Sequence, residues 1–175
     1  MRTPKREFFQ FCWIVDDLQK AMRRWHETAG VGPFFYVENL TMSDHRYRGR
    51  RPGDVRFSVA FANTGPLQIE LIVQHNDVPS SFIDSFGLGG VGFHHAGTIP
   101  GDYDAELARY LEQGVAISHD GTFNGQRFCY LDTRASLGWM VELMELNSST
   151  VEFFATIRES AVDWDGSDPY RAVTM

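Results

Sequence analysis

Two short apolar segments of the sequence are near copies of each other, and each carries one glutamate. Residues 68–71 read QIEL and residues 140–143 read MVEL, so Glu70 and Glu142 occupy corresponding positions in β-prone runs. A carboxylate on the inner face of a strand is unfavourable unless it is paired or bound to a metal. The two segments therefore indicate a duplicated unit whose copies direct acids toward a common site.

The spacing of apolar residues predicts the same order of elements in both halves of the chain. The first half predicts strands at 8–15, 33–40, 55–62 and 67–73, and a helix after Asp17 with an apolar stripe formed by Leu18, Ala21, Met22 and Trp25. The second half predicts strands at 93–99, 115–119, 126–132 and 139–146, and a helix after Asp102. The chain is therefore predicted to be an α+β protein with two tandem βαβββ modules.

Simple offsets relate the two halves. Gln10 corresponds to His95 by a shift of 85 residues, and Asp17 corresponds to Asp102 by the same shift. Glu70 corresponds to Glu142 by a shift of 72 residues, because the first half has a longer loop before its last two strands. A repeat of this kind implies two similar units in which equivalent positions face a shared cleft.

We expect one compact domain with four parts along the chain: a first module at 8–74, a connecting segment at 75–92, a second module at 93–146, and a C-terminal helix and tail at 147–175. The connecting segment includes a glycine-rich joint that lacks the pattern of a phosphate-binding loop. The capping box at 149–152 predicts the start of the last helix. Residues 163–175 are predicted to form a loosely held polar tail, and residues 41–54 a basic loop or irregular hairpin.

The composition argues against a general nucleic-acid-binding protein. The 175-residue chain has a net charge of -7, and its basic residues form one local cluster at 46–51. No apolar run approaches the ~20 residues of a membrane-spanning helix. Cys12 and Cys129 lie in apolar runs without a spacing motif, which predicts buried free thiols. We expect a soluble, cytoplasmic protein that binds a small molecule and neither nucleic acid nor membrane.

Four polar residues at equivalent places in the repeat are predicted to face the cleft together: Gln10, Glu70, His95 and Glu142. Their oxygen atoms and single imidazole suit one divalent metal ion, such as Zn²⁺, Ni²⁺, Co²⁺, Mn²⁺ or Fe²⁺. Taken singly, each of these residues is usually exposed or hydrogen-bonded without a metal. Their matching positions in two similar units are what favours a metal site.

Four segments resemble the signature segments of the vicinal oxygen chelate superfamily, which includes glyoxalase I, methylmalonyl-CoA epimerase, extradiol dioxygenases, and the fosfomycin and bleomycin resistance proteins. The segments are residues 9–18 (FQFCWIVDDL), 68–71, 92–97 (GFHHAG) and 140–143. The resemblance implies paired βαβββ modules that form a cup-like mixed sheet around a metal, and it implies a homodimer. The superfamily's metal ligands fall on Gln10, Glu70, His95 and Glu142.

Residues near these positions distinguish branches of the superfamily. The double histidine before Ala96 most resembles methylmalonyl-CoA epimerase, although that branch usually has a histidine where this chain has Gln10. Glyoxalase I of some organisms uses a Gln, Glu, His, Glu set. Its glutathione-binding arginines, however, correspond to Ile14 and Val91 here. Extradiol dioxygenases and fosfomycin enzymes generally use two histidines and one glutamate, so Gln10 counts against both.

The resemblance implies a metal-dependent isomerase, epimerase or lyase that abstracts a proton next to a carbonyl group, and the substrate could be an acyl-CoA thioester. Glu142 is the expected base as well as a ligand, with Glu70 as its counterpart on the opposite face. The basic cluster offers either a solvated loop or a site for a carboxylate or CoA phosphate through Arg46, Arg48, Arg50 and Arg51. Five phenylalanines belong either to the core or to an apolar acyl pocket: Phe34, Phe35, Phe61, Phe82 and Phe86.

Two other functions stay open. A metal-free binding protein of the bleomycin-resistance kind would sequester an aromatic ligand and would be indifferent to chelators. An Fe²⁺ extradiol-type dioxygenase would consume oxygen with catechols. The paired glutamates favour the isomerase or lyase, because a sequestering protein does not need buried carboxylates.

Overall fold

The computed structural model describes residues 6–174. The first half contributes β1 (Gln10–Ile14), α1 (Leu18–Ala29), β2 (Phe34–Met42), β3 (His45–Tyr47), β4 (Val55–Thr64) and β5 (Leu67–Gln74). After α2 (Ser81–Asp84), the second half contributes β6 (Gly92–Thr98), α3 (Tyr103–Glu112), β7 (Ile117–Phe123), β8 (Gln126–Leu131), α4 (Arg134–Leu137) and β9 (Met140–Glu145). α5 (Ser148–Ser160) and β10 (Tyr170–Ala172) follow.

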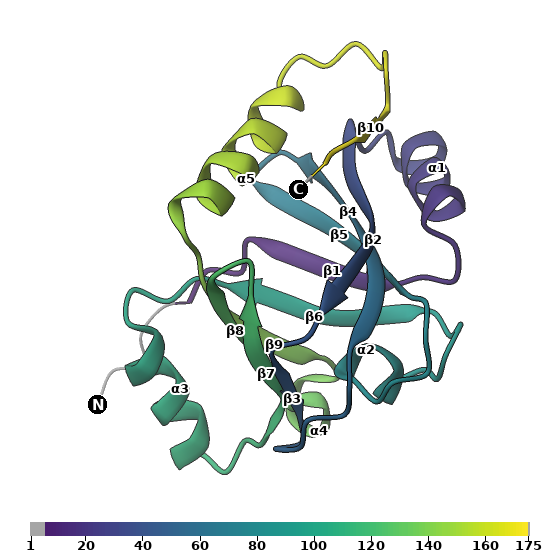
Figure 1. Cartoon of the computed structure of the whole chain (residues 1–175). Coiled ribbons are helices and arrows are strands. Elements are labelled where there is room, and N and C mark those ends of the chain that lie inside the picture. The colour runs from purple at the N-terminus through teal and green to yellow at the C-terminus, as the bar shows by residue number, and fades with distance from the viewer. Residues whose placement is uncertain (1–5, 175) are drawn as a thin grey trace.

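The ten strands of the described residues form one mixed sheet in the order β10-β2-β4-β5-β1-β6-β9-β8-β7-β3. β1 and β6, the first strands of the two halves, are the central antiparallel pair, and β5 and β9 run parallel to the first strand of their own half. The other strands of each half extend the sheet to either side of this pair (Figure 1). This arrangement confirms the predicted α+β class with tandem βαβββ modules.

The strand register obeys the same offsets as the sequence repeat. Gln10 in β1 is opposite Gln68 in β5, and His95 in β6 is opposite Met140 in β9. The second pair follows from the first when 85 is added to one residue number and 72 to the other. The sequence repeat is therefore a structural repeat, and equivalent residues have equivalent neighbours.

Each glutamate of the repeat is opposite a residue of the central strand pair. Glu70 is opposite Cys12, and Glu142 is opposite Gly97. Because alternate residues of a strand share one face, Cys12 lies on the same face of β1 as Gln10. The repeat therefore brings both carboxylates to the middle of the sheet, on one face.

The first helix of each half is capped by the predicted aspartate. The Asp17 carboxylate accepts a hydrogen bond from the backbone nitrogen of Lys20 at 2.9 Å, and Asp102 accepts one from that of Ala105 at 2.9 Å. α1 then packs on β4 and β5, and α3 packs on β9. Both helices cover the sheet from outside and leave its inner face to other elements.

The basic segment 41–54, expected to be a loop or an irregular hairpin, contains β3 and an antiparallel bridge between Tyr47 and Arg50. β2 continues to Met42, and β3 then pairs antiparallel with β7, with His45 opposite Gly121. A side chain at Gly121 would collide with the backbone of Asp44, so this close approach depends on glycine. A strand of the first half thereby completes the outer edge of the second half.

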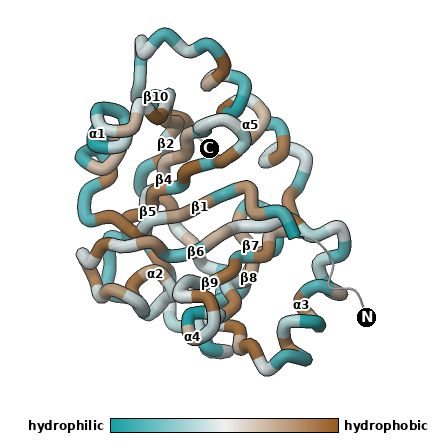
Figure 2. Tube along the Cα trace, turned by 180° about the vertical axis from the view of Figure 1, so that it is seen from behind, coloured by the Kyte–Doolittle hydropathy of each residue, from teal (hydrophilic) through white to brown (hydrophobic). Residues whose placement is uncertain are grey.

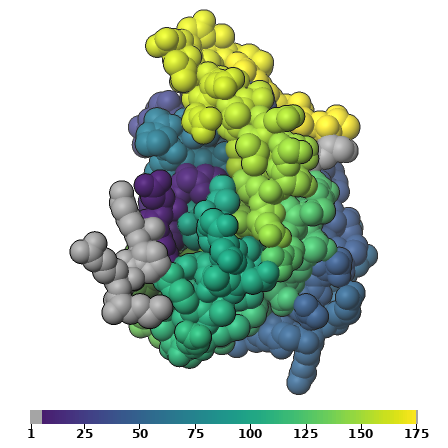
Figure 3. All heavy atoms as spheres, turned by 90° about the vertical axis from the view of Figure 1, so that its left-hand side faces the viewer, coloured from purple at the N-terminus to yellow at the C-terminus, as the bar shows by residue number. Residues whose placement is uncertain are grey.

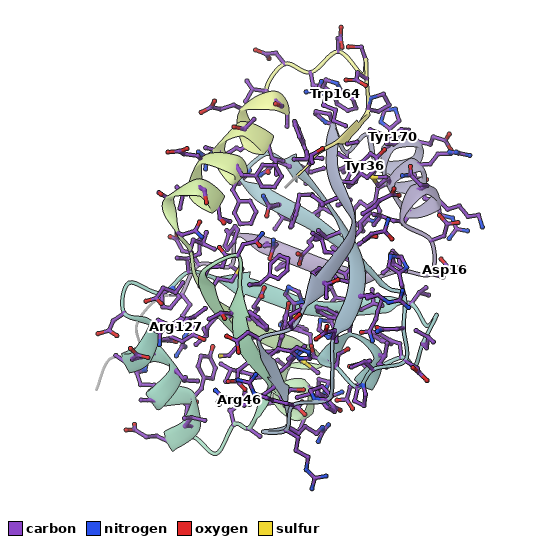
Figure 4. The ribbon with its side chains drawn as sticks, viewed as in Figure 1. Asp16, Tyr36, Arg46, Arg127, Trp164 and Tyr170 are labelled. Atoms are coloured by element: carbon purple, nitrogen blue, oxygen red, sulfur yellow. The ribbon has the colours of Figure 1, made fainter. Side chains whose placement is uncertain are left out.

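The prediction of a loosely held tail is wrong for β10. Tyr170 is opposite Phe34 in a parallel pairing with β2. Ahead of this strand, the Trp164 ring lies over Gly32, where a side chain would clash with it. Figure 4 shows Trp164 and Tyr170 together near α1. The backbone hydrogen bonds of β10 come from its pairing with β2, which is distant in sequence. The polar sequence of the segment does not predict this pairing.

The last helix begins slightly before its predicted capping box. The N-cap is Asn147, whose side-chain oxygen accepts a hydrogen bond from the backbone nitrogen of Thr150 at 2.9 Å. Ser149, the predicted cap, donates its hydroxyl to that same Asn147 oxygen at 2.8 Å. Figure 3 shows α5 as a ridge that runs down beside β1 and reaches the second half of the chain.

Hydrophobic residues concentrate in the sheet. Figure 2 shows hydrophobic stretches along the strands and hydrophilic stretches at loops and on α1. The predicted free, buried state of Cys12 and Cys129 is confirmed. In the part of the chain that the structure describes, no helix has both the length and the apolar character needed to cross a bilayer.

Candidate metal centre

Four strands direct polar side chains to the floor of one cavity. Gln10 from β1, Glu70 from β5 and Glu142 from β9 line the cavity. His95 from β6 meets both glutamates, with its Nε2 atom 3.2 Å from Glu70 Oε2 and 3.1 Å from Glu142 Oε2. All four side chains are buried. The residues that the repeat singled out therefore lie together, beside one cavity.

When His95 Nε2 carries no proton, three atoms of this group have no hydrogen-bond partner within the described residues. They are Gln10 Oε1, Glu70 Oε2 and His95 Nε2, and all are buried. The Gln10 amide nitrogen donates to Gln68 Oε1 at 2.8 Å, which leaves the Gln10 oxygen as the free atom. Buried polar atoms are almost always paired, so such a cluster indicates a missing partner. Two oxygens and one nitrogen at one place fit the donor preferences of a divalent ion.

The hydrogen bonds of a neighbouring histidine determine which nitrogen of His95 faces the carboxylates as an acceptor. His94 Nε2 lies 2.8 Å from the carbonyl oxygen of Ser81, so Nε2 carries the proton. His94 Nδ1 is then an acceptor, and it lies 2.8 Å from His95 Nδ1, which must donate. Neutral His95 therefore presents the Nε2 lone pair to the carboxylates, as a metal ligand requires.

The same reasoning extends through Ser81 to β3. His45 Nε2 donates to the Gly53 carbonyl oxygen at 2.8 Å, so His45 Nδ1 accepts from His119 Nε2, also at 2.8 Å. His119 Nδ1 is left to accept from the Ser81 hydroxyl at 3.0 Å. A buried row of histidines thus connects the candidate site with the segment that crosses between the halves.

The carboxylates control the charge of the site. Burial alone would lower the pKa of His95, but the negative charges of Glu142 and Glu70 outweigh it and raise this pKa to about 9. Burial raises the pKa of Glu142, an effect that His95 opposes and Glu70 reinforces. Burial and the same two glutamates raise the pKa of the Tyr130 hydroxyl well above its usual value. The site therefore favours a cation between the acids, either a proton or a metal.

Cys12 is a site residue that the sequence reasoning missed. Its thiol lies within 4.8 Å of ligand atoms of both Glu70 and His95. Burial and Glu70 raise the pKa of the Cys12 thiol well above its ordinary value. The available signal was its position two residues after Gln10, on the same face of the strand. A nearby sulfur favours Zn²⁺, Co²⁺, Ni²⁺ or Fe²⁺ over harder ions.

Gly97 makes room for the carboxamide of Gln10. A Cβ atom at Gly97 would lie 2.9 Å from Gln10 Oε1 and 2.7 Å from the terminal carbon of Met144. Both distances are shorter than normal contacts. The absence of a side chain at this position therefore allows the glutamine oxygen to lie beside the acids.

The cavity above this floor has a volume of about 460 Å³. Phe61 and Phe82, two of the five phenylalanines considered above, line it together with Phe153 and Phe154 of α5. Phe34 is buried in the outer core instead. Phe35 and Phe86 pack against the inner core.

The basic cluster does not reach the cavity. None of its arginines is among the described residues that line the cavity. Three of them form ion pairs elsewhere: Arg46 with Asp120 at 3.1 Å, Arg48 with Asp84 at 2.9 Å and Arg51 with Asp44 at 3.3 Å. Figure 4 places Arg46 at the opposite end of the molecule from Trp164.

Comparison with known proteins gives a family and a fold. The model of the glyoxalase/bleomycin resistance protein/dioxygenase superfamily matches residues 9–130. Methylmalonyl-CoA epimerase from Mycobacterium tuberculosis is similar with a TM-score of 0.54 and 18% identity, over 82% of this chain and 89% of that one. A hypothetical protein from Bacillus halodurans C-125 has a TM-score of 0.56 and 16% identity, over 83% and 97%.

A methylmalonyl-CoA epimerase in complex with methylmalonyl-CoA and NH4+ has a TM-score of 0.54 and 18% identity, over 82% of this chain and 96% of that one. No curated protein matches the sequence. At these identities the solved structures establish a shared fold and do not establish a shared reaction.

Proposed function

The chain belongs to the glyoxalase/bleomycin resistance protein/dioxygenase superfamily, and we propose that it is a metal-dependent isomerase, epimerase or lyase that removes a proton next to a carbonyl group. The observation that carries this proposal is the convergence of Glu70, His95 and Glu142 beneath an apolar cavity. The acceptor atoms Gln10 Oε1, Glu70 Oε2 and His95 Nε2 fit a divalent ion, and the cavity has room for an organic substrate.

Gln10, Glu70, His95 and Glu142 are the proposed metal ligands, with the thiol of Cys12 close by. The bound ion would polarise the carbonyl group of the substrate and so acidify the adjacent C–H bond. The His94 hydrogen bond keeps the lone pair of His95 directed at the ion. The two glutamates neutralise a 2+ charge, so the loaded site would be electrically balanced.

Glu142 is the proposed base. Burial raises its pKa, whereas a bound cation would lower it, so Glu142 would act as the base once it has left the ion. Tyr130 is opposite Glu142 in the pairing of β8 with β9 and lines the same cavity. Glu70 occupies the equivalent place in the other half and would serve as the acid or base on the opposite face. An epimerase needs two such groups, and the internal repeat supplies them.

The metal site is tested by analysis of the purified protein and by reconstitution after treatment with a chelator. We expect about one divalent ion per chain. The variant His95→Ala should lose the ion, because the nitrogen ligand is removed. The variant His75→Ala should retain it, because His75 is exposed on the end of the sheet. A wild-type protein that binds no Zn²⁺, Co²⁺, Ni²⁺, Mn²⁺ or Fe²⁺ would contradict the proposal.

The reaction is tested by solvent deuterium exchange at the α-carbon of two thioesters. Phenylacetyl-N-acetylcysteamine is a neutral probe, and methylmalonyl-CoA is named for a protein of similar fold. We expect the metal-loaded protein to exchange the α-proton of phenylacetyl-N-acetylcysteamine, with a loss of about 100-fold or more in Glu142→Gln, since general-base catalysis is removed. Exchange that survives this substitution unchanged would exclude Glu142 as the base.

A second candidate is a binding protein of the bleomycin-resistance kind. The observation in its favour is the aromatic lining of the cavity, which would suit a sequestered ring compound. In that case the protein would bind an aromatic ligand equally well before and after chelation, and it would catalyse no exchange. The Fe²⁺ dioxygenase stays the weaker alternative because Gln10 replaces a histidine of the usual ligand set.

A further inference from the structure

The cavity has charged residues only at its floor, among the described residues that line it. Glu70 and Glu142 are these residues, and neither lysine, arginine nor histidine contributes to the walls. Aromatic and aliphatic side chains from both halves form most of the lining. The volume of about 460 Å³ falls in the range of about 300–1,000 Å³ found for sites of small organic molecules.

Among the described residues, the cavity walls offer an anionic substrate group no cation, and their polar side chains Asn124, Gln126, Ser149 and Thr150 are uncharged. A divalent ion would already be balanced by Glu70 and Glu142. A further carboxylate or phosphate at the walls would be buried without a cation, which is strongly unfavourable. The basic cluster does not supply that cation, since none of its arginines lines the cavity and Arg46, Arg48 and Arg51 form ion pairs elsewhere.

α5 contributes the aromatic part of one wall. The rings of Phe153 and Phe154 lie 6.0 and 5.5 Å from the ring of Phe61 on β4, measured between centroids. Both are only partly buried, so each has a surface left for another partner. Phe123 and Phe57, 5.5 Å apart, form a second aromatic pair in the lining. α5 also lies outside the residues that match the family, 9–130.

We infer that the site takes a substrate whose buried part is uncharged and apolar, of the size of one or two rings, with its carbonyl oxygen toward the glutamates. This inference rests on the proposed function for the direction of the carbonyl group. It distinguishes aryl or branched alkyl acyl groups, which would be accepted, from carboxylate-bearing acyl groups, which would be rejected.

Hydroxamates with one chelating group and different tails test the inference on the Co²⁺-loaded protein, by calorimetry. Benzohydroxamate should bind about 10- to 100-fold more tightly than acetohydroxamate, because its ring buries apolar area. Succinic monohydroxamate, with a carboxylate tail, should bind at least about 10-fold more weakly than benzohydroxamate. Equal affinities for the neutral and anionic tails would overturn the inference and leave the metal site intact.

The neutral ketone 2-acetonaphthone provides a test without metal. We expect it to bind the chelator-treated protein, because the apolar walls persist. Binding of this ketone by a protein that never takes up metal would support the apolar cavity and contradict the proposed function. Failure of the ketone to bind, with or without Co²⁺, would overturn the inference.

Two variants locate the binding at the walls. Phe154→Ala should weaken benzohydroxamate binding about 10-fold, whereas Phe8→Ala, an exposed residue outside the lining, should not change it. Phe123→Arg, at a half-buried position of the lining, should shift the preference toward succinic monohydroxamate by adding the missing cation. An unchanged tail preference in folded Phe123→Arg would count against the charge argument.

Discussion

At the scale of single residues, the candidate site depends on neighbours that never touch the cavity. His94 fixes the tautomer of His95, and Gly97 leaves space for Gln10. Neither His94 nor Gly97 is itself a proposed metal ligand. Both act through geometry, since each determines the direction in which a donor atom points.

His94→Phe should weaken metal binding about 10- to 100-fold, the usual effect of losing the hydrogen-bond partner of a ligating histidine. The phenyl ring fills similar space but cannot accept the His95 Nδ1 proton. Competition with a chelator measures the dissociation constant. The control is His75→Phe, which should keep the wild-type value; equal affinities in His94→Phe and wild type would show that the tautomer is fixed by something else.

Gly97→Ala should lower the free energy of unfolding by about 1–3 kcal/mol, because the added methyl group overpacks the space beside Gln10 and Met144. It should also weaken metal binding, since the Gln10 oxygen has to move. Gly101→Ala is the matched control, because no atom lies within 4 Å of a Cβ built there. Urea denaturation of both variants measures the difference, and similar stabilities would contradict the prediction.

At the scale of elements, α5 has a double role. It packs Phe153 and Phe154 against the inner face of the sheet, and it closes one side of the cavity. Its first turn is held by Asn147, which precedes the predicted capping box. The stability of this turn should therefore affect both folding and ligand binding.

Asn147→Ala should lower the free energy of unfolding by about 0.5–2 kcal/mol, because it leaves the backbone nitrogen of Thr150 without its cap. Ser149→Ala should cost less, since Ser149 only supports the cap. Thermal or urea unfolding compares the two variants. A larger loss of unfolding free energy in Ser149→Ala than in Asn147→Ala would instead support Ser149 as the cap, as the sequence predicts.

At the scale of the whole molecule, strand pairing connects the two halves at two places in the described sheet. β1 and β6 pair at the centre, and β3 of the first half pairs with β7 at the far edge. The buried His119 is hydrogen-bonded to His45 at the second of these places. The expected homodimer stays a prediction, and analytical ultracentrifugation would test it.

Acid should weaken the fold through His119. Burial and the neighbouring His45 lower the pKa of His119 to about 3, whereas an unfolded histidine titrates near about 6.5. The unfolded chain therefore binds more protons between these values, and stability should fall as the pH drops from about 6.5 toward 3. The slope due to this residue is at most about 1.4 kcal/mol per pH unit.

His119→Asn should therefore show a shallower loss of stability between pH 7 and pH 5 than the wild type. Urea unfolding at several pH values measures both slopes. An identical slope in His119→Asn and wild type would assign the acid sensitivity to other groups.

The sequence alone was enough to predict the repeat, the fold class and the four polar residues that lie together at the floor. These are local or periodic features: alternation along a strand, helical spacing, aspartate caps and constant offsets. The register of β1, β5, β6 and β9 then follows the offsets, because equivalent residues in a structural repeat have equivalent neighbours.

Only the tertiary structure decided what surrounds those residues. The Cys12 thiol at the site, the histidine row to β3, the strand β10 and the aromatic wall from α5 all join segments distant in sequence. Such contacts depend on how the whole chain packs, and no local pattern encodes them. The two glutamates were therefore readable from the sequence, whereas the set of side chains that encloses the cavity above them was not.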